Sequence, residues 1–394
     1  MSAPLYLDHN ATTPVDPVVL DAMLPFMTAQ FANPSATYES GRLSRRAIDL
    51  ARDQVAASVD ADPSEVVFTA SGSEANNLLI QGLARAYRAE TGESLHLACA
   101  ATEHPCVLAP MRALHNEGFG FYELPVDGQG ELGAETMGSL PAAPKRLVSV
   151  MTANNETGVV QAVAALAGAF RASHPGWFHS DAVQAFGKHP LSFRALNDAG
   201  VAALTISGHK LGGPKGAAAL VRDRALPLQP LIYGGGQEAG LRSGTENVAA
   251  IVGLGVACER AAANLAQRTE QALACRTWLE NALRQRGAVI FGDHVTRLPN
   301  TTYAAFPGID GETLVSLLDR QNVAISSGAA CGSGKAGASP VLQAMGVDPV
   351  LAKGAIRISL GMMSHAASDQ QSVERFMAQL DTVLSQLQRF AAVA

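Results

Sequence analysis

The sequence predicts an α/β fold whose larger part is a mostly parallel sheet covered by helices on both faces. Short β-rich runs alternate with longer helical patterns up to about residue 260, which is typical of such sheets. Polar and glycine-rich stretches follow several of these runs, and in sheets of this class the ligand binds beyond the carboxyl ends of the strands. After about residue 260 the pattern changes, which indicates a second, smaller α/β domain.

The larger domain is expected over residues 15–260. Residues 65–70 (EVVFTA) and 95–100 (LHLACA) each precede a helical stretch. The other predicted strands of this domain are 146–151, 177–182 and 201–207. The apolar run 248–258 is shorter than the roughly 18–20 residues that span a bilayer, so it is interpreted as a buried helix.

The smaller domain is expected to combine residues 1–14 with residues 261–394. A long amphipathic helical region covers residues 257–287. Its predicted strands are 301–306 and 323–327, and a C-terminal helix is predicted from about Gln370. A loop at about 326–338, rich in glycine and other small residues, belongs to this domain.

Composition excludes several classes of protein. Of the 394 residues, 47% are hydrophobic and 16% are charged, as in globular chains of two domains. The net charge of −6 without runs of like charge argues against a nucleic-acid partner or a membrane-binding arm. No signal peptide is recognisable, and five cysteines without a C-x-x-C pair indicate reduced thiols and no zinc site. We therefore expect a cytoplasmic protein without a metal.

Lys210 and Asp181 are the residues that point to a cofactor. Lys210 follows an apolar strand and is surrounded by glycines, which let a ligand approach closely. Most such lysines are surface residues, but a lysine in a desolvated pocket can form a Schiff base. Asp181 ends a strand predicted to be buried, where it is either a capping residue or the partner of a cation. A lysine together with an aspartate facing a pyridinium nitrogen is the usual protein environment of pyridoxal 5′-phosphate.

A phosphate-binding cup is predicted at residues 69–77 (TASGSEANN). This segment joins a strand to a helix, so that Gly72 and Ser73 supply N–H groups at the helix N-terminus. By itself the pattern is also a common helix cap. Together with Ser207 and His209, it favours an anion site.

The segment 326–337 (SSGAACGSGKAG) allows a dinucleotide turn, a phosphate loop or a mobile loop that carries Cys331. A phosphate loop needs four residues between its glycine and Gly-Lys, whereas five separate Gly328 from Gly334, and Ala336 replaces the hydroxyl residue. A dinucleotide turn needs a helix directly after it. The nucleotide-binding alternative is therefore disfavoured, and an accessible cysteine in a loop of small residues is favoured.

Nine segments in order resemble the cysteine desulfurases, which are pyridoxal-phosphate enzymes of the class-V aminotransferase fold. They cover nearly the whole chain and are YLDHNATTPVDP (6–17), ANPSA (32–36), ATEHPCVL (101–108), NNETGVVQ (154–161), HSDAVQAFGK (179–188), SGHKLGGPKG (207–216), GGGQEAGLRSGTEN (234–247), SSGAACGSG (326–334) and IRISLG (356–361). The resemblance implies a pyridoxal-phosphate-dependent transferase of fold type I. It also implies the branch with an extended cysteine loop.

The resemblance assigns cofactor roles residue by residue. Lys210 would hold the cofactor, Asp181 would pair with its pyridine nitrogen, and Gln184 would hydrogen-bond its phenolic oxygen. His104 would stack on the ring and assist proton transfer. The phosphate would contact Gly72, Ser73, Ser207, His209 and, from the partner subunit, Thr245. The complete site therefore implies a homodimer.

The resemblance also assigns the substrate chemistry. Arg357 would bind the carboxylate of L-cysteine, although a surface ion pair is the commoner role of such an arginine, and Asn155 would contact substrate and cofactor. Cys331 would take the sulfur as a persulfide, release L-alanine, and pass the sulfur to an iron–sulfur scaffold protein or a thiolation pathway. The other four cysteines are interpreted as inert buried thiols.

Some positions depart from the family pattern, and alternatives stay open. Tyr38, Gln237, Thr157 and Lys335 replace residues that are more frequent in the family, which leaves the sulfur acceptor open. A selenocysteine lyase or an aminotransferase of the same fold would share the cofactor residues. An aminotransferase has no need of Cys331, which distinguishes the two activities. A scaffold protein with a degenerate site is disfavoured because every candidate catalytic residue is present.

Overall fold

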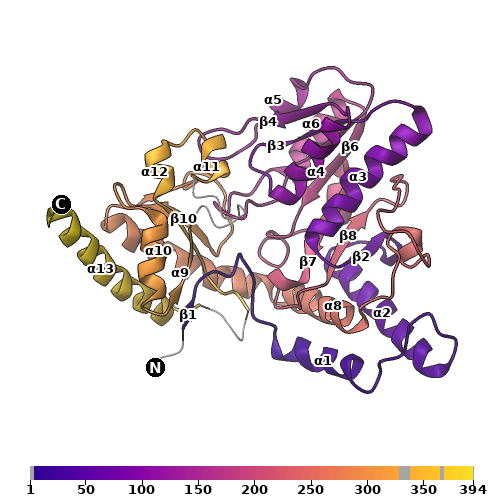
Figure 1. Ribbon diagram of the computed structural model, residues 1–394, viewed down its shortest axis with the longest axis horizontal. Coiled ribbons are helices and arrows are strands. Elements are labelled where there is room, and N and C mark those ends of the chain that lie inside the picture. Colours follow the sequence, from indigo (N-terminus) through magenta and orange to yellow (C-terminus); the bar gives the residue numbers. More distant parts are fainter. Residues whose placement is uncertain (1–3, 328–337, 364–367, 394) are drawn as a thin grey trace.

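The computed structural model describes residues 4–327, 338–363 and 368–393. Figure 1 shows a larger body built on a central sheet and a smaller body that carries the C-terminal helix α13 (Gln370–Val393). The α/β architecture with a mostly parallel central sheet confirms the fold class predicted from the sequence.

The central sheet has the strand order β2-β8-β7-β6-β5-β3-β4. The bounds are β2 (Val66–Thr69), β3 (His96–Ala100), β4 (Phe121–Leu124), β5 (Arg146–Ser149), β6 (Gly176–Asp181), β7 (Val201–Ser207) and β8 (Ala218–Arg222). Strands β7, β6, β5, β3 and β4 are parallel, whereas β8 runs antiparallel to both β7 and β2. The connection between β7 and β8 is shorter than the dozen or more residues that a crossover to a parallel strand needs, so β8 runs antiparallel to β7. The sequence did not predict β4 or β8.

Helices cover both faces of this sheet. The elements are α1 (Pro17–Met27), α2 (Glu39–Ser58), α3 (Gly72–Thr91), α4 (Pro105–Asn116), α5 (Glu135–Gly138), α6 (Val163–Ser173), α7 (Phe193–Ala199) and α8 (Val248–Ala263), with short 3-10 turns η1 (Pro63–Glu65), η2 (Gly208–Lys210) and η3 (Glu238–Gly240). Alternate strand residues face opposite ways: in β7, Leu204 and Ile206 pack with α6 and α8, while Ala203 packs with α3 and α4. Two apolar cores, one on each face, therefore bury the sheet.

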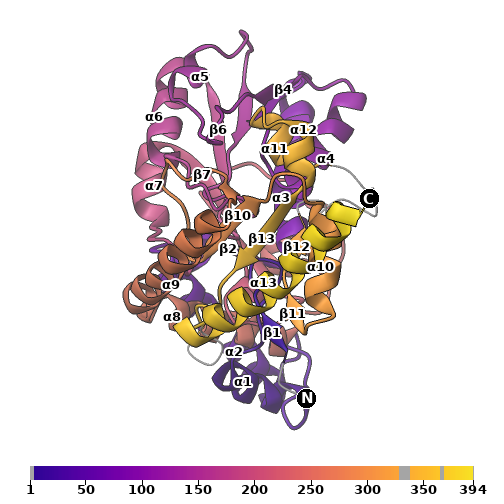
Figure 2. The ribbon, with the colours of Figure 1, turned by 90° about the vertical axis from the view of Figure 1, so that its left-hand side faces the viewer.

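The smaller body contains an antiparallel sheet of order β12-β13-β10-β9. Its strands are β9 (Val289–Ile290), β10 (Thr301–Ala305), β12 (Ser326–Ser327) and β13 (Ala355–Ser359); β1 (Leu5–Tyr6) pairs separately with β11 (Val323–Ala324). Its helices are α9 (Leu265–Gln285), α10 (Gly311–Asp319), α11 (Pro340–Ala344) and α12 (Pro349–Lys353), and Figure 2 shows α13 lying across this body beside α10. Leu5 and Leu7 join its apolar core.

Two elements of this region differ from the prediction. The single strand expected at 323–327 is divided between β11 and β12, which pair with different partners. The helical region expected at 257–287 is broken at Asn264, where the axis bends by 71° between α8 and α9. The Asn264 side chain donates a hydrogen bond to the Arg260 carbonyl at 2.8 Å. No described helix is long and apolar enough on its own to cross a bilayer. Taken together, α8 and α9 reach the required length and apolar composition, but with the 71° bend between them.

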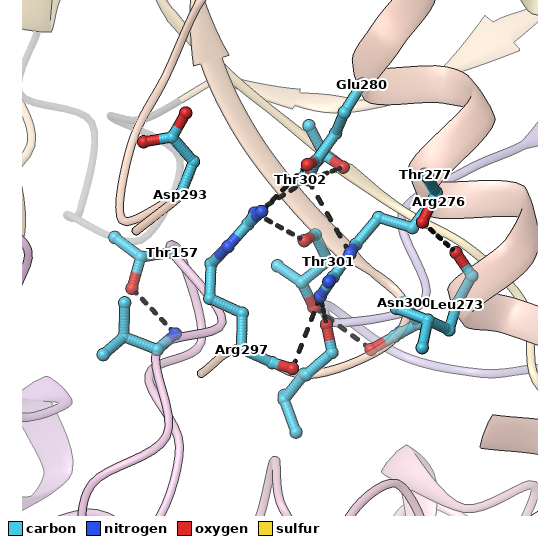
Figure 3. A network of polar contacts seen from close by, with 12 residues as sticks. Thr157, Leu273, Arg276, Thr277, Glu280, Asp293, Arg297, Asn300, Thr301 and Thr302 are labelled. Carbon is cyan, nitrogen blue, oxygen red and sulfur yellow. Dashed lines mark hydrogen bonds and ion pairs between the residues drawn. The ribbon is translucent and has the colours of Figure 1, made fainter. Parts of the chain in front are cut away.

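A buried ionic network lies in the smaller body, next to the loop that follows β5 (Figure 3). Glu280 on α9 accepts two hydrogen bonds from Arg297, at 2.7 and 2.9 Å, and one from Thr302 at 3.0 Å. The segment around Arg297 in turn bonds to the loop after β5: the Leu298 amide donates to Gly158 at 2.7 Å. Thr157, one of the departures from the family pattern, accepts from the Val159 amide in that loop. The loop that carries Asn155 is therefore fixed from both sides.

Candidate active site

A cavity of about 500 Å³ opens between the two bodies and is lined by ten of the residues predicted from the sequence. Those residues are Gly72, Ser73, His104, Asn155, Asp181, Gln184, Ser207, His209, Lys210 and Arg357. They come from the ends of β2, β3, β5, β6 and β7 and from β13 of the smaller sheet. Strands that end at one edge of a parallel sheet thus bring residues far apart in sequence together.

Lys210 lies in the turn η2 immediately after β7. Its Nζ atom donates to the backbone carbonyls of Asn10, at 2.5 Å, and Ala11, at 2.7 Å. The N-terminal segment therefore holds the lysine amine at the cavity wall.

Asp181 is buried at the end of β6 and held by several donors. Its Oδ1 atom accepts from the Val183 amide at 2.9 Å, and its Oδ2 atom accepts from Asn76 Nδ2 at 2.7 Å. The Cys106 Sγ atom lies 3.8 Å from Oδ2. A fixed, buried carboxylate that lines a cavity is suited to pair with a cationic ligand group.

His104 is the N-cap of α4, and this position defines its tautomer. Its Nδ1 atom accepts from the Cys106 amide at 3.1 Å, so the neutral ring carries its proton on Nε2. Burial lowers the pKa of His104; the charge of Lys210 acts in the same direction and that of Asp181 opposes it. The neutral imidazole can therefore donate a hydrogen bond from Nε2.

Cys106 is less buried than its prediction as an inert buried thiol implied. It is only partly buried, lines the cavity, and has its Sγ atom 2.9 Å from His104 Nδ1. Burial, reinforced by Asp181, raises the pKa of its thiol, so the group stays protonated. Its contacts make it a neighbour of the site rather than a nucleophile.

An anion cup is formed at the N-terminus of α3. Ser71 caps the helix by accepting from the Glu74 amide at 3.1 Å, and Gly72 and Ser73 follow in the first turn. A Cβ atom on Gly72 would lie 3.0 Å from a methyl group of Val183, so a larger residue would crowd this wall of the cavity. Amide groups at a helix N-terminus favour a phosphate.

His209 faces the same cavity as a neutral ring. Burial and the positive charges of Lys210, Lys215 and Lys188 lower the pKa of His209 to about 4. Ser207, at the end of β7, also lines the cavity. Both side chains can offer hydrogen bonds to a phosphate without adding a charge.

Arg357 on β13 is buried rather than part of a surface ion pair. Its guanidinium donates to Asp8 Oδ1 at 2.8 Å and to the Asn155 carbonyl at 2.9 Å. The Arg357 side chain is 5% exposed. An arginine so placed at the cavity wall can bind a substrate carboxylate.

Two predicted residues are not part of this cavity as described. Thr245 lines a second cavity of about 580 Å³, together with Met23, Phe26 and Phe31. Cys331 lies outside the described residues, as does Lys335. Ser326, five residues before Cys331, does line the first cavity.

Several residues of the site were missed by sequence reasoning. They are Asp8, Asn10, Asn76, Cys106 and the buried Lys188. All five fall in segments that carry the family resemblance or form the phosphate cup, but the residues next to them in the sequence give no sign of a chemical role. No cluster of three or more His, Cys, Asp or Glu side chains suited to a metal ion occurs in the described parts of the chain.

Comparisons with known proteins identify one family and one fold. The class-V aminotransferase family matches residues 5–376. A cysteine desulfurase of Mus musculus is 42% identical over 91% of this chain and 77% of that protein, and the cysteine desulfurase IscS of Methanosarcina thermophila is 36% identical over 98% and 93%. A solved NifS-like protein superposes with a TM-score of 0.89, at 34% identity over 97% of this chain and 99% of the other. These findings confirm the resemblance predicted from the nine segments.

Proposed function

The chain belongs to the class-V aminotransferase family and, within it, to the cysteine desulfurases, and from this we propose that it converts L-cysteine to L-alanine and carries the removed sulfur on Cys331. The observation that carries the proposal is the single cavity in which Lys210, Asp181, the anion cup and Arg357 converge. Each of these features matches one part of the cofactor or substrate.

The donor set of the cavity fits pyridoxal 5′-phosphate. Lys210 would hold it through Nζ, Asp181 would pair with its pyridine nitrogen, and His104 would contact its ring. Gln184 would hydrogen-bond its phenolic oxygen, while Gly72, Ser73, Ser207 and His209, which line the same cavity, would bind its phosphate. When bound, this cofactor withdraws electrons from the substrate and stabilises negative charge on its Cα atom.

The residues around it orient L-cysteine and move its protons. Arg357 binds the α-carboxylate, with Asn155 beside it. Lys210 takes and returns protons at Nζ, and the neutral His104 ring offers a hydrogen bond from its Nε2–H group. The Cys331 thiolate attacks the substrate sulfur: an S–S bond forms and the Cβ–S bond breaks. The electron pair of the broken bond stays with the carbon skeleton, which takes up a proton and leaves as L-alanine.

The active unit is proposed to be a homodimer. Thr245 does not line the first cavity of its own chain, which fits a role in the phosphate site of a partner subunit. The exposed apolar side chains near Thr245, such as Phe31 at 82% exposure, fit burial in such an interface.

The persulfide sulfur on Cys331 is then transferred to a scaffold protein for iron–sulfur clusters or to a thiolation pathway in the cytoplasm.

The variant Cys331→Ala tests the activity. It should bind added pyridoxal phosphate and L-cysteine like the wild type but lose sulfide and alanine production by about 100-fold or more, because the nucleophile is absent. Cys275→Ala, a thiol on α9 outside the cavity, is the matched control and should stay active. Full activity of Cys331→Ala, or a wild type that binds no cofactor, would contradict the proposal.

The same assay separates the alternatives. Sulfide and alanine in equal amounts support a desulfurase, whereas a transferred amino group without sulfide supports an aminotransferase. A selenocysteine lyase would turn over L-selenocysteine and leave L-cysteine almost unchanged.

A further inference from the structure

Lys188 is a buried lysine behind the candidate site to which the proposed function assigns no role. Lys188 is 2% exposed. Its Nζ atom lies 2.8 Å from Gln184 Oε1 and 3.0 Å from Asn10 Oδ1. Burial, together with the cations Lys210 and Arg357, holds its pKa well below the ordinary value of a lysine. Burying an amine costs free energy, and hydrogen bonds to its neighbours offset part of this cost.

The two contacts fix the orientation of the Gln184 amide. Because the Lys188 nitrogen donates to both neighbours, Gln184 must turn its carbonyl oxygen towards it. The amide nitrogen then donates to the Asn10 backbone carbonyl at 2.8 Å. A reversed amide would place its oxygen against that carbonyl oxygen, so both ends of Gln184 oppose reversal.

This orientation matters because Gln184 lines the cavity. Its nitrogen carries two hydrogens, and the Asn10 carbonyl accepts one of them. Among the described residues no other acceptor for this nitrogen is found, so the second hydrogen remains for a ligand. With the opposite orientation, the Gln184 side chain would present its carbonyl oxygen to the cavity.

The same amine orders the segment that holds Lys210. Asn10 Oδ1 accepts from Lys188 and from Asn300 Nδ2, the latter at 3.2 Å, so its Nδ2 atom donates to Thr301 Oγ1 at 2.9 Å. The Asn10 backbone carbonyl accepts from both Gln184 and Lys210. Lys188 and Asn300 therefore together orient the Asn10 amide, which lies between the smaller sheet and the cavity.

We propose that Lys188 is a positioning residue, whose amine fixes the Gln184 amide so that its nitrogen, and not its oxygen, faces the cofactor. The inference rests on the proposed function, because it requires pyridoxal phosphate in the cavity. The Gln184 N–H group then donates to the phenolic oxygen of the cofactor and stabilises negative charge on it. Without Lys188 only the Asn10 carbonyl opposes reversal, so the reversed amide becomes populated and part of this stabilisation is lost.

The variant Lys188→Met removes the donor with little change in volume, and the holoenzyme is titrated by visible absorbance. Negative charge on the phenolic oxygen is greatest when the chromophore formed with Lys210 is deprotonated. Loss of the donor should therefore raise the pH midpoint of the absorbance change by about 0.5–1 unit. The turnover number should fall, with a smaller change in the KM for L-cysteine.

A double-variant cycle tests whether Lys188 acts through Gln184. Lys188→Met should shift the midpoint in the wild-type background and have almost no effect in a Gln184→Ala background. Equal shifts in both backgrounds, or no shift in the wild type, would overturn the inference. Lys353→Met, at a lysine with a 68% exposed side chain, is the matched control and should not move the midpoint.

Two further measurements keep the inference testable. If Lys188→Met does not fold, neutron diffraction of the wild-type holoenzyme decides: deuterium on the Gln184 atom that faces Lys188 overturns it, and deuterium on the other atom supports it. Cofactor binding by the wild type tests the proposed function alone. A wild type that binds cofactor while Lys188→Met leaves the midpoint unchanged refutes only the role of Lys188.

Discussion

At the scale of single residues, the candidate site consists of buried polar groups that are each held by a second residue. Asp181 is held by Asn76, His104 by the Cys106 amide, and Arg357 by Asp8. Such preorganisation reduces the reorganisation needed when charge develops during a reaction. Substitutions at these residues should therefore alter chemistry more than stability.

Asp181→Asn should bind pyridoxal phosphate but turn over L-cysteine more slowly by about 100-fold or more, because an amide cannot keep the pyridine nitrogen protonated. Steady-state kinetics of the cofactor-saturated protein measure this effect. Asp223→Asn, at a residue outside the cavity, provides the control and should retain wild-type rates. An active Asp181→Asn variant would remove the aspartate from the proposed chemistry.

His179 should make the protein sensitive to acid. Its ring is fully buried in β6 between Ser149 Oγ at 2.8 Å and Thr205 Oγ1 at 3.2 Å, and burial lowers the pKa of His179 to about 3. Below its ordinary pKa of about 6.5 the unfolded chain binds a proton that the folded chain does not, so stability falls as the pH falls from 6.5 towards 3.

The loss attributable to His179 should be roughly 2–3 kcal/mol between pH 7 and pH 4.5. Urea unfolding at the two pH values measures it, and His179→Gln should show a correspondingly smaller difference. His294→Gln, with a 79% exposed side chain, should leave the wild-type difference unchanged. An unaltered pH dependence in His179→Gln would assign the effect to other groups.

At the scale of elements, the larger body contains a close contact between two helices that cover its sheet. α8 packs against α2, and a Cβ atom on Gly255 would lie 2.8 Å from Ala51 Cα. A side chain at this position must push the helices apart, since the obstacle is backbone.

Gly255→Ala should therefore lower the free energy of unfolding by about 1–3 kcal/mol, despite the better helix propensity of alanine. Thermal or urea denaturation measures the change. Gly138→Ala on α5, where an added Cβ meets nothing within 4 Å, is the matched control and should be neutral or slightly stabilising. Equal stability of the two variants would show that the α2–α8 contact has room for a methyl group.

At the scale of the whole molecule, the two bodies meet through polar contacts and through a small apolar cluster in which Leu298 packs with Ala153, Val160 and Ala185. Arg297 and Glu280 have side chains that are 4% and 6% exposed, and the ion pair lies where the smaller body meets the loop after β5 (Figure 3). Removing one partner of a buried pair leaves an uncompensated charge.

Glu280→Gln should lower the free energy of unfolding by about 3–5 kcal/mol, because Arg297 and the neighbouring Arg276 would lose their carboxylate. Glu123→Gln in the exposed pair with Arg112 should change it by less than about 1 kcal/mol. Denaturant unfolding of both variants provides the comparison. Similar values for the two would mean that the Glu280 pair is effectively solvated.

The proposed dimer can be tested by mixing inactive subunits. Lys210→Ala and Thr245→Ala chains, unfolded and refolded together, should form mixed dimers with one site that combines Lys210 of one subunit with Thr245 of the other. Activity at low cofactor concentration should then rise above that of either variant alone, up to about half of the wild type per mixed dimer. No recovery would place Thr245 in the site of its own chain.

Much of the site was predictable because its residues stand immediately after strands. Gly72, His104, Asp181 and Lys210 each follow a β-rich run, and parallel strands bring their carboxyl ends to one edge. The antiparallel β8 and the break at Asn264 were not predictable, because hydrophobic pattern fixes the type of an element but neither its direction in a sheet nor its bend. The domain limits and the roles of the site residues stay predictions.

The sequence by itself determined the fold class, the family and most of the residues that line the cavity, since these depend on local pattern and on motifs that can be read along the chain. Only the tertiary structure decided how those residues are held. Asp8 opposite Arg357, Asn76 opposite Asp181, and Lys188 behind Gln184 are contacts between distant segments, and a lysine or asparagine in a sequence carries no sign of its partner. Hydrogen-bond direction, burial and the resulting pKa values arise from three-dimensional packing, which brings these segments within bonding distance.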